Sequence, residues 1–260
     1  MKAGILHWVL LWVIVLLFNG CSSDEPDQSD IHLIAHRGSS YQYPENSAEA
    51  IQVLIPAGIT HLETDLVFTS DDSVVLFHDY QTDRLTTFNQ PVIETPTARL
   101  RSGFFNQTGG TLLTFEQFAR RFGSGFDRIY LDLKWGQGEA VYKVIRQVVT
   151  LSSRYNLDRR LVVTSTNANQ LDSIRALNPD IQVAYDRDPA GLEICIRNHY
   201  PMLLLHREDV SPDIVKGAAS AGVKLVGYGY TTLPDLQAAV AVGVSDLMTD
   251  NPIGFKSWFD

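Results

Sequence analysis

Cysteine is nearly absent from this 260-residue chain, which has only two, at positions 21 and 195. A fold held together by several disulfides is therefore excluded. Basic residues are also scarce, because 21 lysines and arginines face 30 acidic residues, for a formal net charge of −9. Such a surface offers no electrostatic footprint for a phosphate backbone, so we expect no nucleic-acid partner.

Long apolar runs are missing except at the start of the chain. Residues 5–18 are almost entirely apolar, follow Met1-Lys2, and give way to Gly20-Cys21 and an acidic, polar stretch. A charged start followed by a short apolar run is typical of a secretory signal. A small residue before Cys21 resembles the bacterial lipoprotein box, in which the cysteine is lipidated and becomes the mature N-terminus.

We therefore predict a lipoprotein-type signal peptide at residues 1–20 and a flexible acidic spacer at 21–30. An uncleaved N-terminal anchor is the alternative, and both place the protein at the cell envelope, membrane-anchored on the periplasmic or extracellular face. Removing residues 1–20 removes Lys2, which leaves 20 basic against 30 acidic residues, or about −10. With Cys21 acylated no internal disulfide can form, and the apolar neighbours of Cys195 predict a buried helix face.

No linker rich in Pro, Gly or Ser divides residues 31–260, so we expect one domain there. Short apolar runs alternate with segments of helical period. Strands are expected at 32–36, 61–68, 73–78, 128–134, 161–165, 181–185, 202–206, 223–228 and 245–249. Helices are expected at 47–57, 114–122, 138–154, 168–177, 190–198, 211–221 and 233–242. Wholly apolar strands alternating with helices predict an α/β fold, a single (β/α)8 TIM barrel.

Nine strands are one too many for that barrel. Asp71-Asp72 separates the second and third strands with too little chain for a crossover helix, so these two strands are expected to form a hairpin or one broken strand. Residues 80–111 show little periodicity and predict a long loop after the third strand. We expect a lid or substrate-contacting element there, with a decorative insertion as the alternative.

Reactive side chains gather near the ends of the first apolar runs, between Ile34 and Asp79. They comprise two histidines, an arginine and two carboxylates at strand spacing: His36, Arg37, Glu63, Asp65 and His78. Parallel strands deliver such side chains to one rim of a barrel. This set can hold a hard metal ion, bind a phosphate and move protons.

Six short motifs occur along the chain in an order that resembles one family. They are His36-Arg37-Gly38, Pro44-Glu45-Asn46, Glu63-Thr64-Asp65, His78-Asp79, Leu131-Asp132-Leu133-Lys134 and Thr249-Asp250-Asn251-Pro252. Together they resemble the glycerophosphodiester phosphodiesterase family, from Ile31 to about Pro252. The resemblance implies a TIM barrel with one divalent cation that hydrolyses glycerophosphodiesters, its small-molecule substrates, to glycerol phosphate and an alcohol.

Glu63 and Asp65 are two residues apart on a strand, so their side chains share one face and can bind a single cation. Asp132, from another strand, stands where the family typically has glutamate and is our third ligand. Because all three ligands are oxygens, Mg²⁺ or Ca²⁺ is the expected cofactor. A pair of surface carboxylates is the alternative interpretation.

A histidine side chain can take up and release a proton near neutral pH, so His36 and His78 are our candidates for catalytic proton transfer. Arg37 is expected to bind the phosphodiester through its planar guanidinium group, and Lys134 to neutralise the same phosphate. The other histidines of the predicted domain lack acidic neighbours of this kind and are expected to be structural or surface residues: His32, His61, His199 and His206.

Two further positions complete the expected substrate-binding set. Asn46 is expected to orient the His36 loop or contact substrate, and capping of the helix that begins near Ser47 is the alternative. Tyr228 stands where the family has a tryptophan and Thr231 where it has an asparagine, so the resemblance implies an altered wall for the alcohol group.

Two other functions remain open from the sequence. A related barrel phospholipase of the sphingomyelinase D type would use the same metal and histidine pair on an intact lipid, and an aspartate as third ligand fits it. A non-catalytic binding lipoprotein on the same scaffold is the other. The two histidines and three candidate carboxylates favour catalysis, and the products formed from glycerophosphocholine, lysolipid or sphingomyelin would distinguish the functions.

Overall fold

Eight parallel strands close into a barrel, as predicted. The computed structural model describes residues 30–134 and 139–259. Around the barrel the strands follow the order β1 (His32–Ala35), β9 (Asp246–Thr249), β8 (Lys224–Tyr230), β7 (Met202–His206), β6 (Gln182–Asp186), β5 (Leu161–Ser165), β4 (Arg128–Leu133) and β2 (His61–Phe68). β1 also pairs with β2 in parallel, with Ile34 opposite His61, and this pairing closes the sheet. The predicted signal peptide and nearly all of the predicted spacer lie outside the described residues.

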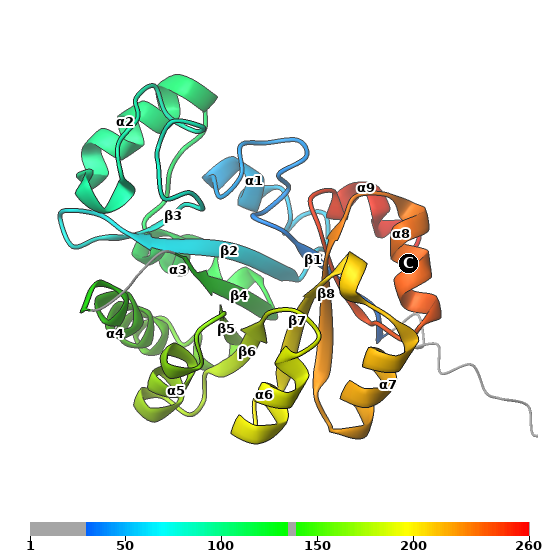
Figure 1. Cartoon of the computed structure of the whole chain (residues 1–260). Coiled ribbons are helices and arrows are strands. Elements are labelled where there is room, and N and C mark those ends of the chain that lie inside the picture. The colour runs from blue at the N-terminus through cyan, green and yellow to red at the C-terminus, as the bar shows by residue number, and fades with distance from the viewer. Residues whose placement is uncertain (1–29, 135–138, 260) are drawn as a thin grey trace, which may run out of the picture.

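The helices surround the strands, as Figure 1 shows for α4 to α8. Those of the described residues are α1 (Ala48–Gln52), α2 (Thr97–Thr108), α3 (Phe115–Arg121), α4 (Glu139–Arg154), α5 (Ala168–Leu177), α6 (Gly191–Asn198), α7 (Pro212–Ser220), α8 (Leu233–Ala241) and α9 (Pro252–Lys256). Side chains cap many of their N-termini. The capping box at Thr114 and Gln117, for example, fixes the start of α3.

The ninth strand is the second arm of a hairpin, which confirms one of the two arrangements expected for it. β3 (Val74–Leu76) pairs antiparallel with the end of β2, with Leu66 opposite Leu76. Asp72 makes the turn in the left-handed region, at a φ of 60°. β3 therefore lies outside the closed barrel, and the chain continues from it toward the barrel mouth.

The segment after β3 is more ordered than the sequence indicates. Residues 80–111 were expected to be irregular, but they contain a short 3-10 helix at Val92–Glu94 and the twelve-residue helix α2. α2 starts after Pro96 and ends at Gly109, which has a φ of 72° and so closes the helix in the left-handed conformation. Its buried face has only two large apolar side chains, Leu100 and Phe104, so its helical period is weak in the sequence.

The core has an inner and an outer layer. The larger outer layer packs the strands against the helices and includes Cys195, which is fully buried on α6 as predicted. The inner layer fills the barrel with side chains from seven of the eight parallel strands: Ile34, Tyr130, Val162, Ala184, Met202, Leu204, Val226 and Met248. β2 supplies no apolar side chain to this inner layer, although all eight of its residues are buried.

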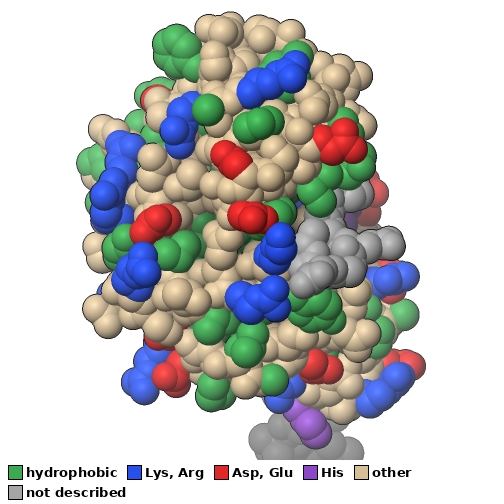
Figure 2. Space-filling view, turned by 90° about the vertical axis from the view of Figure 1, so that its left-hand side faces the viewer, with side chains coloured by type: hydrophobic (Ala, Val, Ile, Leu, Met, Phe, Trp, Pro, Cys, Tyr) green, Lys and Arg blue, Asp and Glu red, His purple; other side chains and the backbone are tan. Residues whose placement is uncertain are grey.

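The surface of the described residues carries charges of both signs. On the face that includes α2 and α4, Figure 2 shows Lys and Arg side chains interspersed with Asp and Glu. None of the described helices combines the length and the apolar character that crossing a bilayer requires.

Candidate functional site

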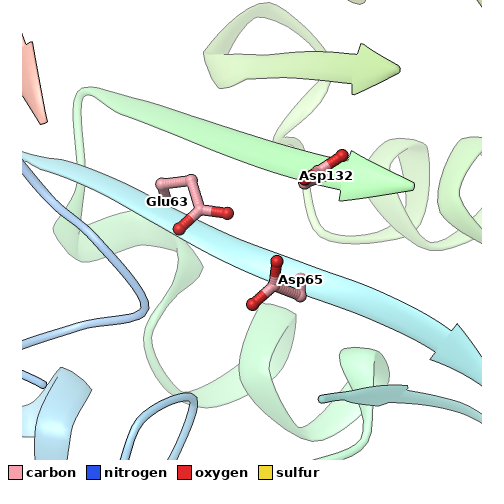
Figure 3. Close-up of side chains that lie close together, drawn as sticks. All are labelled: Glu63, Asp65 and Asp132. Atoms are coloured by element: carbon pink, nitrogen blue, oxygen red, sulfur yellow. The ribbon is translucent and has the colours of Figure 1, made fainter. Parts of the chain in front are cut away.

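The acidic residues of the candidate site come from two neighbouring strands. Glu63 and Asp65 alternate along β2, and Asp65 lies directly opposite Asp132 of β4 in the parallel register. Figure 3 shows the three side chains on these two strands. One carboxylate oxygen from each lies within 4.8 Å of the others, and only 3% of Glu63 and 1% of Asp65 is exposed. The sequence prediction that these three carboxylates converge is confirmed.

Burial sets the charge state of this cluster. Desolvation raises the pKa of Glu63 above its usual value, and the negative charge of Asp65 raises it further. Desolvation also raises the pKa of Asp132. Burial acts the same way on Asp65, but Arg37 and Lys134 outweigh it and hold that pKa below its usual value. Nearby positive charge therefore favours the ionised form of Asp65, whereas burial disfavours the ionised forms of Glu63 and Asp132.

The donor set fits a hard divalent cation. All three candidate ligands are carboxylates, and Oδ1 of Asp65 is buried without a hydrogen-bond partner among the described residues. A buried acceptor with no donor is costly unless a ligand completes its interactions. Oxygen donors of this kind suit Mg²⁺ or Ca²⁺ better than a soft metal.

Arg37 and Lys134 border the acidic cluster. Nε of Arg37 lies 3.2 Å from Oδ2 of Asp65, and its Nη1 donates to Glu45 at 3.0 Å. The backbone N–H of Arg37 donates to Glu63 at 3.0 Å, an arrangement in which Arg37 adopts a φ of 55°. Nζ of Lys134 contacts Asp132 and lies 3.5 Å from Oδ1 of Asp65. Both cations therefore lie beside the carboxylates that could hold a metal ion.

Each predicted catalytic histidine is held by a carboxylate at Nδ1. Nδ1 of His36 lies 2.6 Å from Oδ1 of Asp250, and Nδ1 of His78 lies 2.7 Å from Oδ1 of Asp79. Burial lowers the pKa of His36, but the bond to Asp250 and the charge of Glu63 outweigh it, so this pKa is raised. A carboxylate at Nδ1 fixes the orientation and tautomer of the imidazole ring.

Arg84 connects the His78 side of the site with the Arg37 side, a role that was not predicted from the sequence. It comes from the segment that follows β3. Its Nε donates to Asp79 at 2.5 Å, and its Nη1 and Nη2 donate to the two oxygens of Glu45 at 2.6 and 2.7 Å. Asp79 holds His78 and Glu45 holds Arg37, so one guanidinium group supports both. A single arginine in an irregular stretch gives no sequence signal for such a role.

Asn46 lies beneath the acidic cluster rather than at a helix cap. Its Nδ2 donates to Asp65 at 2.8 Å, and its Oδ1 accepts from the Thr64 hydroxyl and the Asp65 backbone. Only 1% of Asn46 is exposed. The alternative that Asn46 caps α1 is wrong, because the N-cap is Ser47, whose hydroxyl accepts from the Ala50 backbone N–H. Both ends of the Asn46 amide are thus engaged by β2.

A cavity of about 200 Å³ brings these groups together at the carboxyl ends of the strands. It is lined by His36, Arg37, Glu63, His78, Asp132, Lys134, Thr164, Asp186, Leu204, Tyr228 and Met248. Of the nine predicted site residues, only Asp65 and Asn46 are not part of its wall. Asp186 was not predicted, although it ends the apolar run of β6 at the rim.

Tyr228 forms part of this wall through an irregularity in β8. The register between β8 and β9 shifts between Gly227 and Tyr230. Gly229 has a φ of 84°, and a Cβ there would lie 2.7 Å from the ring of His206. The His206 ring meets the Tyr228 ring edge to face, with centroids 5.4 Å apart. His206 is therefore a structural neighbour of the cavity wall, in line with its expected role.

Solved structures support the fold. A phosphodiesterase from Oleispira antarctica, solved in complex with its product sn-glycerol-3-phosphate, is 23% identical, with a TM-score of 0.75 over 88% of this chain and 97% of its own. A glycerophosphodiester phosphodiesterase from Parabacteroides distasonis is 21% identical, with a TM-score of 0.73 over 88% of this chain and 96% of its own. Both are similar to this chain along nearly the whole barrel.

Sequence comparison gives the family. A glycerophosphodiester phosphodiesterase from Caldanaerobacter subterraneus is 24% identical over 231 residues, which cover 85% of this chain and 94% of the relative. The family model described as the glycerophosphoryl diester phosphodiesterase family matches residues 36–253, a range that begins at His36 and includes every residue of the cavity wall. The chain therefore belongs to the glycerophosphoryl diester phosphodiesterase family.

Proposed function

We propose that this protein is a metal-dependent phosphoric diester hydrolase that cleaves glycerophosphodiesters to glycerol phosphate and an alcohol. The observation that carries the proposal is one cavity that joins a three-carboxylate cluster, two histidines held by carboxylates, and two cationic side chains. Family membership supports the same reaction.

Glu63, Asp65 and Asp132 are the residues that would hold one Mg²⁺ or Ca²⁺ ion. When bound, the ion would neutralise phosphate charge and act as a Lewis acid. Asn46 serves as a positioning residue in this proposal, because its amide fixes one oxygen of Asp65 and leaves the other toward the cluster.

Arg37 and Lys134 bind the phosphodiester. A phosphodiester resists attack largely because its negative charge repels nucleophiles, so the site must offset that charge before reaction. Arg37 is held in place by Glu45 and Asp65, so little side-chain freedom is lost when it binds an anion. Lys134 supplies a second positive charge beside Asp132.

His36 and His78 transfer the protons. One takes a proton from the attacking oxygen, and the other donates a proton to the departing alcohol. Since Asp250 and Asp79 contact Nδ1 of their respective histidines, we assign proton transfer to Nε2 of each ring. Nε2 of His36 lies 3.9 Å from Oε2 of Glu63, which places it at the edge of the metal cluster.

A product assay tests the proposal. The full chain in detergent, with Mg²⁺ or Ca²⁺, is incubated separately with glycerophosphocholine, lysophosphatidylcholine and sphingomyelin. We expect glycerol phosphate and choline from the first substrate. Choline released mainly from the two intact lipids would instead support the sphingomyelinase D type of reaction. No product from any of them would support the non-catalytic alternative.

We further propose that Cys21 is lipidated and tethers the barrel to a membrane at the cell envelope. The apolar run at residues 5–18 and the Gly20-Cys21 pair support this. β1 begins at the end of the barrel opposite the cavity, so such a tether would attach at the amino-terminal end of the barrel. Labelling with a palmitate analogue should mark the wild type and not Cys21→Ser, and an unlabelled wild type would contradict the anchor.

A further inference from the structure

Asp186 is the one carboxylate of the cavity wall that belongs neither to the metal cluster nor to a histidine pair. It ends β6 and lies opposite Leu204 of β7 in the parallel register. Its side chain lines the same cavity of about 200 Å³ as His36 and Lys134. It can therefore contact a small molecule whose phosphate is bound by Arg37 and Lys134.

The structure gives Asp186 no hydrogen bond and no ion pair with residues 30–134 and 139–259, and the charge of Lys134 acts on it only from beyond ion-pair distance. Lys134 contacts Asp132 and Asp65 instead, and Arg37 pairs with Glu45 and Asp65. Desolvation and the charge of Asp132 raise the pKa of Asp186 to about 7, and the charge of Lys134 offsets only part of that rise.

The wall beside Asp186 is aromatic and apolar. Tyr228, Leu204 and Met248 line it. Asp186 and Tyr228 line the same cavity, and burial together with the charge of Asp186 raises the pKa of Tyr228 to about 12. The Tyr228 ring is held edge to face by His206, which itself packs over Gly229. This wall therefore offers a fixed aromatic ring next to an unpaired carboxylate.

We propose that Asp186 and Tyr228 form a subsite for a positive charge on the leaving alcohol. A carboxylate attracts an ammonium group directly, and the face of an aromatic ring attracts it through the ring quadrupole. The favoured substrates would be glycerophosphodiesters of small amino or quaternary ammonium alcohols, rather than of neutral or anionic alcohols. This inference deepens the proposed function and rests on it.

The test compares two substrates that differ only in charge. One is glycerophosphocholine, and the other is its carbon isostere, the 3,3-dimethylbutyl diester of glycerol phosphate. We expect the wild type to favour the choline diester in kcat/KM by about 10-fold, the scale of a contact to a charged group. In Asp186→Asn, which keeps the shape but removes the charge, the ratio should fall to about 3-fold or less, because only the Tyr228 ring still attracts the ammonium group.

Three control variants sharpen the result. Asp188→Asn removes an exposed carboxylate two residues away that does not line the cavity, and it should keep the wild-type ratio. Tyr228→Phe keeps the ring and should also keep the ratio, whereas Tyr228→Leu removes the ring and should lower it. A circular dichroism spectrum of each variant checks that the barrel has folded.

Several outcomes would overturn the subsite. Equal kcat/KM values for the two substrates in the wild type would do so. A fall in kcat/KM by the same factor for both substrates in Asp186→Asn would also do so. If the wild type hydrolyses neither diester, the proposed hydrolase activity fails, and calorimetric titration then tests the subsite separately. In that case tighter binding of glycerophosphocholine than of its isostere, lost in Asp186→Asn, would support it, and equal binding would refute it.

Discussion

The two ends of the barrel both bury carboxylates, but only the carboxylate described at the amino-terminal end is completely paired. At the amino-terminal end, Asp246 is fully buried and contacts Nζ of Lys224 at 2.5 Å, the Ser245 hydroxyl at 3.0 Å and the Tyr130 hydroxyl at 3.3 Å. At the carboxyl-terminal end, Glu63 and Asp132 have raised pKa values and Asp65 retains a buried oxygen without a hydrogen bond.

This difference separates structural from functional polar groups. A buried polar network that is complete stabilises one arrangement of the core. An incomplete one costs stability unless a ligand completes it, and strained or unpaired groups of this kind gather at functional sites. We therefore expect substitutions at the amino-terminal end to reduce stability and substitutions at the cavity to reduce activity.

Glu63→Gln should give the largest effect. We expect turnover of glycerophosphocholine to fall on the order of 1,000-fold, the upper range for losing one electrostatic contact in an active site. The melting temperature of the metal-free protein should stay equal or rise, because burial and the charge of Asp65 disfavour the ionised form of Glu63 when no metal is bound. A kinetic assay and a thermal melt measure the two. A large drop in melting temperature would show that Glu63 is a structural residue.

Replacing either of the two catalytic histidines should give the second largest effect on activity. His36→Ala and His78→Ala should each lower kcat by at least about 100-fold, the usual scale for a positioned general acid or base. His199→Ala provides the control, because His199 ends α6 far from the cavity wall. If either catalytic variant retains more than a tenth of the wild-type kcat, that histidine transfers no proton in the slow step.

Asp246→Asn tests the opposite end of the barrel. It should lower the free energy of unfolding by about 1–3 kcal/mol, the cost of leaving buried partners poorly paired. It should leave kcat/KM unchanged, because Asp246 lies at the far end of the strands from the cavity. Urea unfolding and a kinetic assay measure the two effects. A loss of activity with unchanged stability would reverse the comparison between the two ends.

His61 gives the amino-terminal end a pH dependence. It stacks on His32 with ring centroids 4.4 Å apart, and desolvation, together with the charge of His32, lowers its pKa to about 4. In the unfolded chain a histidine has a pKa of about 6.5, so the unfolded state binds more protons between pH 6.5 and 4. The stability that neutral, buried His61 contributes to the folded protein is therefore fully present above pH 6.5 and is lost as the pH falls toward 4.

The measurement is urea unfolding across that pH range. Between pH 6.5 and 4, the free energy of unfolding of the wild type should fall by on the order of 1–2 kcal/mol more than that of His61→Gln. The glutamine can keep a polar contact to Thr60 but does not titrate. Parallel curves for the two proteins would mean that His61 takes up no proton on unfolding in this range.

Arg84→Gln should give the smallest effect. Arg84 supports His78 through Asp79 and Arg37 through Glu45, but its side chain is 46% exposed and solvent can replace part of the interaction. We expect kcat/KM to fall several-fold, with a shift in the pH profile of kcat because Asp79 would hold His78 less firmly. Arg84→Lys should recover part of the loss. An unchanged pH profile would limit Arg84 to a structural role.

Several features of the fold and site follow from local sequence patterns. Alternating apolar strands and helices predict the barrel, and the two-residue spacing of Glu63 and Asp65 predicts their shared face. α2 escapes prediction because its buried face is short and its sequence is mostly polar. Asn46 resembles a helix cap in the sequence, yet its φ of 58° turns it toward β2.

Other features depend on tertiary contacts that no local pattern encodes. Asp250 holds His36 from 214 residues away, on the loop after the last strand. Arg84 reaches Glu45 across 39 residues. Asp186 is one acidic residue at the end of one strand, and only barrel closure shows that it shares a cavity with His36 and Lys134.

The most direct test of the central claim is the turnover of glycerophosphocholine by the full chain after exhaustive chelation. The incomplete carboxylate cluster predicts that the chelated protein is inactive and that added Mg²⁺ or Ca²⁺ restores activity in the wild type but not in Glu63→Gln. Full activity of the chelated wild type, with no response to either ion, would contradict a metal site at Glu63, Asp65 and Asp132.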